Sequence, residues 1–136
     1  IKLKGCMLME ALITNVDWLA VGVSTIICYL FASFWFSSWL FGEKWADGVG
    51  VENGLEKNFS VYALVSQFFA TLLLAWIVSL AVGNDSLLFI ALISFMVFFF
   101  LLAANLMADH SVYASLAEGV FVLAISTIMT ISNLLL

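Results

Sequence analysis

The chain has 136 residues, of which 65% are hydrophobic and only 10% are charged, and its mean hydropathy is +1.21. A soluble domain of this size covers itself with charged side chains, so the composition excludes water as the main solvent of the folded chain. The formal net charge is -5 and arginine is absent, which argues against nucleic acid as a partner. The sequence therefore predicts an integral membrane protein whose principal partner is the lipid bilayer.

Four long apolar blocks can each cross a bilayer. Proline is absent, so the blocks can run as uninterrupted helices. At about 1.5 Å per residue each block is long enough for a hydrocarbon core of about 30 Å. The predicted fold class is therefore all-α, with one domain over 1–136 that forms an integral membrane bundle of four transmembrane helices. The expected spans are 18–41, 59–82, 86–106 and 113–134, and the main extramembrane loop is 42–58.

The first predicted span begins after polar residues that are suited to capping a helix. Asn15 and Asp17 are the candidate caps, and Gly42 is expected to end the helix. Aromatic residues gather around that end, as they do in the belt of amphipathic rings at a membrane–water interface. This pattern predicts a membrane-interface motif made of Trp35, Phe41, Gly42 and Trp45.

Short turns connect the remaining spans. The second and third spans are separated only by the turn at 83–85, so they must form an antiparallel hairpin. The turn at 107–112 joins the third span to the fourth in the same way. Four crossings place both termini on the same side of the membrane.

The orientation follows from the few lysines. The chain begins with Ile1 and not with methionine, so residues 1–8 are expected to be a non-native or flexible leader. Lys44 and Lys57 remain, and both lie in the first loop. The positive-inside rule then makes that loop cytoplasmic and places both termini outside the cytoplasm.

Stripes of small and weakly polar residues mark one face of three predicted spans. In lipid, helices associate through close packing of small residues and through interhelical hydrogen bonds, so these stripes should face inward. They identify a packed bundle and not a function. Their members are Thr25, Cys28 and Ala32; Ser60, Ala63, Gln67 and Thr71; and Ser115, Gly119, Ser126, Thr130 and Asn133.

Glu118 is the polar residue that most needs an explanation. In a fourth helix that begins near Ser111 it lies about 10 Å along the axis, deep enough to lose much of its hydration. Alternating the directions of the four spans brings other polar residues toward the same membrane face. The predicted polar cluster, a candidate proton or solute site, consists of Glu118, Gln67, Asn105, Asp109, His110 and Ser37.

Three interpretations compete for this cluster. In the first, Glu118 is protonated or hydrogen-bonded and only fixes the helix register. In the second, Glu118 and His110 exchange protons or bind a cationic or polar solute, because histidine side chains titrate near neutral pH. The third, a membrane enzyme or lipid-binding protein, requires a lipid-sized groove beside these residues. A histidine in a turn is most often a solvated capping residue, and the sequence predicts no catalytic residue, metal or cofactor.

One stretch resembles a known family. The chain from Trp35 to Trp45, preceded by Asp17-Trp18-Leu19-Ala20-Val21, is similar to a bacterial family catalogued as domain of unknown function 1761. Phe36 stands where that family usually has tyrosine, and Ser38 stands in place of a proline. The resemblance implies a small four-span protein of a bacterial inner membrane, and it implies no catalytic residue. The run itself reads Trp35-Phe36-Ser37-Ser38-Trp39-Leu40-Phe41-Gly42-Glu43-Lys44-Trp45.

The leading functional prediction is a structural or interaction subunit that is not an enzyme. So small a bundle encloses little interior, so we expect a homo-oligomer or a larger membrane protein as partner. The alternative is a small channel or transporter for protons, cations or a small polar solute around Glu118. A water-filled vestibule that reaches Glu118 would favour transport, and a dry, hydrogen-bonded Glu118 would favour the interaction role.

Overall fold

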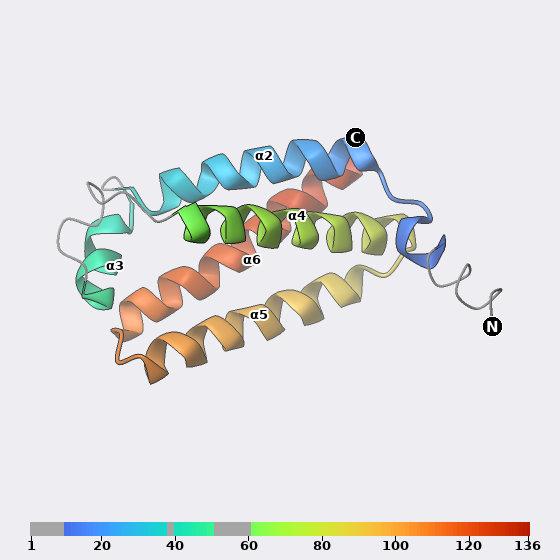
Figure 1. The fold of residues 1–136 in the computed structure, drawn as a ribbon. Helices are drawn as coiled ribbons and strands as arrows, with labels where there is room; N and C mark the ends of the chain where they lie inside the picture. Colours follow the sequence, from blue (N-terminus) through green and yellow to red (C-terminus); the bar gives the residue numbers. More distant parts are fainter. Residues whose placement is uncertain (1–9, 38–39, 51–60) are drawn as a thin grey trace.

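The computed structural model describes residues 10–37, 40–50 and 61–136. Four helices in this part of the chain are long and apolar enough to cross a membrane, and a fifth, α3, is short. The prediction of an all-α, four-span membrane bundle is confirmed (Figure 1). The helices are α2 (Trp18–Trp35), α3 (Gly42–Val49), α4 (Val61–Gly83), α5 (Leu87–Met107) and α6 (Val112–Leu135).

The first span is shorter than expected and ends at Trp35. The hydroxyl of Ser37 donates to the carbonyl of Phe34 at 2.6 Å, and the amide of Gly42 donates to the carbonyl of Ser37 at 3.0 Å. The chain therefore folds back over the helix end. Gly42 permits this because a Cβ atom there would lie 2.1 Å from the carbonyl oxygen of Phe36. The prediction that Gly42 ends the first helix is wrong, since Gly42 begins α3.

The predicted loop at 42–58 contains a helix. α3 is amphipathic, with Ala46 buried and its charged residues exposed, and it ends at Gly50, whose φ of 77° suits glycine. It packs on α6, where the amide of Ser111 donates to the carbonyl of Gly48 at 2.9 Å. The positions 51–58 of the predicted loop lie outside the described residues.

The long helices do not form an evenly closed bundle. α2 packs against α4 and α6, and α5 packs mainly against α6. α4 and α5 are joined by a short turn but diverge away from it, and α6 lies behind the space between them (Figure 1). α6 is therefore the central helix. Half of its apolar membrane-spanning stretch is buried, whereas that of α5 is mostly exposed. The core where the helices meet includes Val21, Cys28, Ala75, Val78, Phe121, Ile125 and Met129.

The helix caps follow the sequence in part. Asp17 caps α2, since its carboxylate accepts from the amide of Ala20 at 3.1 Å. Asn15 is not a cap: it has a φ of 60° and its side-chain amide donates to the Oδ1 atom of Asn84 at 3.3 Å. The start of α2 thus lies beside the turn between α4 and α5, at the same end of the bundle as the last residue of α6 (Figure 1).

The small-residue stripes face inward on two of the three helices. On α6, Gly119 lies against Phe98, and the hydroxyls of Ser94 and Ser126 are 2.8 Å apart across α5 and α6. The expectation is wrong for the first half of α4, where every residue from Val61 to Ala70 is exposed. That half makes only a few contacts, such as the hydrogen bond from the hydroxyl of Tyr29 to the carbonyl of Leu64, and a sequence pattern on one helix cannot show this. The buried members are Thr25, Cys28, Thr71, Ser115, Gly119 and Ser126, and Ser60 lies outside the described residues.

Candidate functional site

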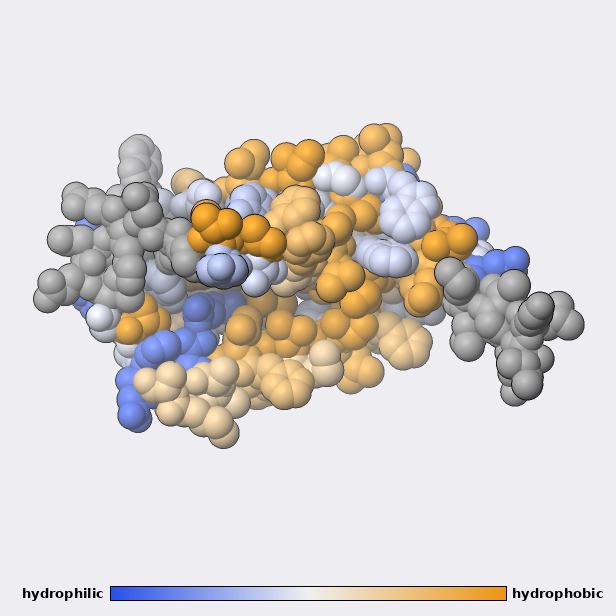
Figure 2. Space-filling view, viewed as in Figure 1, coloured by the Kyte–Doolittle hydropathy of each residue, from blue (hydrophilic) through white to orange (hydrophobic). Residues whose placement is uncertain are grey.

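A cavity of about 710 Å³ opens among the long helices on the side of α3. Its walls come from α2, α4, α5 and α6, and α3 supplies Gly42 and Trp45. In Figure 2 hydrophobic surface covers the middle of the bundle, and hydrophilic surface gathers near the turn between α5 and α6. The lining of the cavity is mixed. Its polar side chains are Tyr29, Ser33, Trp45, Gln67, Thr71 and Glu118, and its aliphatic ones include Leu64, Leu74, Val97, Leu101, Val122 and Ile125.

Glu118 lines this cavity from α6. It is half-buried on α6, about 9 Å along the axis from Val112 at 1.5 Å per residue. Its carboxylate interacts with the side chains of Asn105 and Trp45, and the charge of His110 acts on it. A carboxylate at this depth is costly unless it is paired. Here it has polar neighbours on one side and the cavity on the other.

Asn105 and His110 hold one another behind Glu118. The Nδ1 atom of His110 lies 2.6 Å from the Oδ1 atom of Asn105, and the Nδ2 atom of Asn105 donates to the carbonyl of Leu101 at 2.8 Å. Because an amide oxygen can only accept, Nδ1 of His110 carries the proton in this contact. Asn105 is only 8% exposed. His110 therefore fixes the side chain of Asn105, which in turn interacts with Glu118.

The other predicted members of the polar cluster are not gathered at Glu118. Gln67 lines the same cavity from α4, but on the exposed half of that helix. Asp109 is exposed in the turn after α5 with a φ of 61°, and it does not line the cavity. The hydroxyl of Ser37 donates to the carbonyl of Phe34 at the end of α2. The structure thus brings Glu118, Asn105 and His110 together, adds Gln67 across the cavity lining, and leaves the other two apart.

The predicted interface motif is built largely of internal contacts. The indole nitrogen of Trp35 donates to the carbonyl of Ala117 on α6 at 3.1 Å. The ring of Phe41 packs against Trp35 with 4.6 Å between ring centroids. Gly42 and Trp45 line the cavity. The motif therefore joins α2, α3 and α6, and does more than place rings at a headgroup layer.

Two aromatic residues of the cavity, Tyr29 and Phe121, received no role from the sequence. Phe36 packs against Trp45 at 5.1 Å and against Phe121 at 5.5 Å between centroids, and all three line the cavity. Tyr29 also lines it and donates from its hydroxyl to the carbonyl of Leu64 at 3.3 Å, which ties α2 to α4. The chain has many phenylalanines, so their abundance conceals the few that share a cavity.

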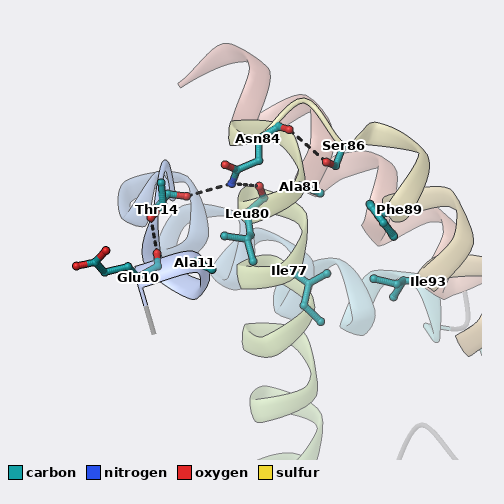
Figure 3. Close-up of a pocket in the computed structure, with 10 residues that line it drawn as sticks. All are labelled: Glu10, Ala11, Thr14, Ile77, Leu80, Ala81, Asn84, Ser86, Phe89 and Ile93. Atoms are coloured by element: carbon teal, nitrogen blue, oxygen red, sulfur yellow. Dashed lines mark hydrogen bonds between the residues drawn. The ribbon is translucent and has the colours of Figure 1, made fainter. Parts of the chain in front are cut away.

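A second cavity, of about 580 Å³, lies at the opposite end of the bundle (Figure 3). The side-chain amide of Asn84 donates there to the carbonyls of Thr14 at 3.1 Å and Leu80 at 2.8 Å. The hydroxyl of Thr14 donates to the carbonyl of Glu10. The polar side chains of Asn84 and Thr14 are thus engaged in holding the chain that leads into α2. Within the described ranges, no group of three or more His, Cys, Asp or Glu side chains could hold a metal ion.

No family model, curated protein or solved structure matches the chain. The resemblance to the family catalogued as domain of unknown function 1761 therefore stays a prediction from the residues at 17–21 and 35–45.

Proposed function

We propose that this small multi-pass membrane protein binds an amphiphilic molecule in the cavity beside Glu118. The observation that carries the proposal is that the cavity is lined mainly by apolar side chains and by one carboxylate, that of Glu118. Its volume of about 710 Å³ falls within the ~300–1,000 Å³ of ordinary ligand pockets. An apolar chain fits along Leu74, Val97 and Ile125 while a polar head meets Glu118. The proposal includes no chemical step.

The cavity is the reason to prefer binding over the purely structural role that the sequence favoured. A carboxylate that only fixed the helix register would be packed closed, whereas Glu118 lines a cavity. A conduit for ions needs polar groups along its length. Two turns beyond Glu118 on α6 the cavity is lined by Ile125, and two turns beyond Gln67 on α4 it is lined by Leu74. The lining therefore suits a ligand better than a path for protons or small polar solutes.

We place the entry to the cavity between α4 and α5, because residues of both helices, such as Leu74 and Val97, line it. A molecule already dissolved in the bilayer could enter between these helices from the side. Lipid tails are as apolar as leucine, so burial of its chain gains little free energy relative to the membrane. Selectivity must therefore come from the shape of the cavity and from the polar groups around Glu118.

A photolabelling experiment tests this proposal. The protein is reconstituted in nanodiscs with a neutral single-chain alcohol that carries a diazirine on its alkyl chain, and labelled residues are mapped by mass spectrometry. We expect labels on cavity residues of α4 and α5, such as Leu74 and Val97. Ala70→Phe fills the cavity and should reduce this labelling several-fold, whereas Ala91→Phe, on an exposed position outside the cavity, should not.

The opposite result is equally clear. If labels spread evenly over the exposed surfaces of α5, and Ala70→Phe changes nothing, the molecule only dissolves around the protein and the cavity is not a binding site. The structural role would then be the better proposal.

We further propose the setting in which binding takes place: a bacterial inner membrane, with both termini outside the cytoplasm, and a homo-oligomer or a larger membrane protein as partner. The resemblance and the lysines of the first loop support the membrane and the orientation. The exposed stretch from Val61 to Ala70 supports a partner. Cysteine crosslinking from Val65, which is exposed on α4, should trap a dimer if that partner is a second copy, and Leu88 of α5 serves as the control position.

A further inference from the structure

We infer that the polar head of the bound amphiphile is an ammonium cation held by Glu118 and the aromatic rings beside it. This inference rests on the proposed function, because it names the class of ligand that the same cavity takes. Among the described residues that line the cavity, Glu118 is the one acidic side chain, and no basic side chain lines it. In a site of low dielectric constant the carboxylate attracts a cation strongly and repels an anion.

The rings supply the second reason. Phe36, Trp45 and Phe121 line the cavity together with Glu118, and their centroids are 5.1 Å apart for Phe36 and Trp45 and 5.5 Å apart for Phe36 and Phe121. The face of an aromatic ring attracts cations, and clusters of such rings are a recurrent way to hold an ammonium group. A neutral alcohol head gains nothing comparable from these rings.

Among the described residues, no lysine or histidine lines the cavity. Lys44 is exposed on α3 and lies 5.3 Å above the ring of Tyr113. His110 is bound to Asn105 through Nδ1, and neither Lys44 nor His110 lines the cavity. Around this end of the described chain, Glu43 and Asp47 on α3 add exposed negative charge. On the cavity side of Glu118 the described residues therefore leave room for a ligand cation, while the charge of His110 acts on the carboxylate from behind.

Competition against the neutral photolabel tests the inference separately from the proposed function. The probes are dodecyltrimethylammonium and its uncharged isostere, in which a carbon atom replaces the nitrogen. We expect the cation to displace the label at a concentration roughly tenfold lower than the isostere. Glu118→Gln should abolish this difference and keep displacement by the isostere. Glu43→Gln, on the exposed face of α3, is the matched control and should preserve the difference.

A second variant keeps the test independent of whether Glu118→Gln folds. Phe36→Leu keeps the carboxylate and its contact with Trp45 but removes a ring, and should reduce the preference for the cation about threefold. Equal displacement by cation and isostere in the unmodified protein would overturn the inference and leave the proposed function intact. Failure of both to displace a label that Ala70→Phe also leaves unchanged would overturn both.

A third comparison identifies the source of the ammonium group. The photolabel experiment is repeated in nanodiscs of phosphatidylglycerol with and without phosphatidylethanolamine. If the ethanolamine lipid displaces the label from the unmodified protein and not from Glu118→Gln, the ligand is a membrane lipid. If only the single-chain cation does so, the ligand is a lipophilic amine that reaches the cavity through the bilayer.

Discussion

The two ends of the bundle each carry a cavity, and they use their polar residues differently. At the end where α4 turns into α5, Asn84 donates to the carbonyls of Thr14 and Leu80 (Figure 3). Asn15 donates in turn to the side chain of Asn84. Those side chains fasten one backbone segment to another. At the end near α3, Asn105 and His110 bind one another, and the carboxylate of Glu118, which also interacts with Asn105 and Trp45, lines the cavity.

The two ends therefore differ in whether their polar side chains bond only to the protein or are also available to a ligand. A buried polar group whose partners belong to the protein stabilises the fold, so removing it lowers the free energy of unfolding. A carboxylate that lines a cavity gains most from a partner that arrives from outside. Substitutions at the two ends should therefore change different measured quantities.

The largest expected effect is on the contact that holds the α3 end together. In Gly119→Leu, the new side chain meets Phe98, since even a Cβ atom would lie 2.6 Å from its Cδ2 atom, so α5 and α6 are forced apart. Overpacking of this kind costs about 1–3 kcal/mol, which should appear as a lower thermal midpoint in detergent. Gly22→Leu is the matched control, because nothing lies within 4 Å of a Cβ atom at Gly22. Equal midpoints in the two variants would contradict the close α5–α6 contact.

The next effect tests the opposite end. Asn84→Ala removes the bonds to Thr14, Leu80 and Asn15, and should lower the free energy of unfolding by about 1 kcal/mol. The preference for the ammonium probe should not change. Asn133→Ala, which removes only a bond to the carbonyl of Met129 in its own helix, is the control. A change in ligand preference in Asn84→Ala would break the separation between the two ends.

The sequence predicted three of the four spans to within about two residues because their limits depend on local chemistry. The second, third and fourth spans were expected at 59–82, 86–106 and 113–134, and α4, α5 and α6 occupy Val61–Gly83, Leu87–Met107 and Val112–Leu135. Uninterrupted apolar residues define their lengths. Local caps define their ends, as at Ser111, which accepts from the amide of Ala114 at 3.0 Å.

The break after Trp35 and the cavity depend on contacts between distant residues, which a pattern cannot show. Apolar and aromatic residues continue past Trp35, yet the helix stops because the chain around Gly42 returns to its last turn. The depth of Glu118 could be predicted from spacing along one helix. The cavity beside it arises because α4 and α5 diverge, and both helices are apolar on nearly every face, so no periodicity indicated their relative tilt.

The smallest effect concerns a residue that acts through another. His110→Leu removes the donor that fixes Asn105, so Asn105 should hold Glu118 less firmly. We expect the preference for the ammonium probe over its isostere to fall about twofold, consistent with the loss of one modest hydrogen bond. His110→Gln, which can donate in the same place, should restore most of it. Asp109→Asn, in the same turn but away from the cavity, should have no effect. If His110→Gln behaves like His110→Leu, the hydrogen bond to Asn105 does not position Glu118, and the two ends differ only in where their cavities lie.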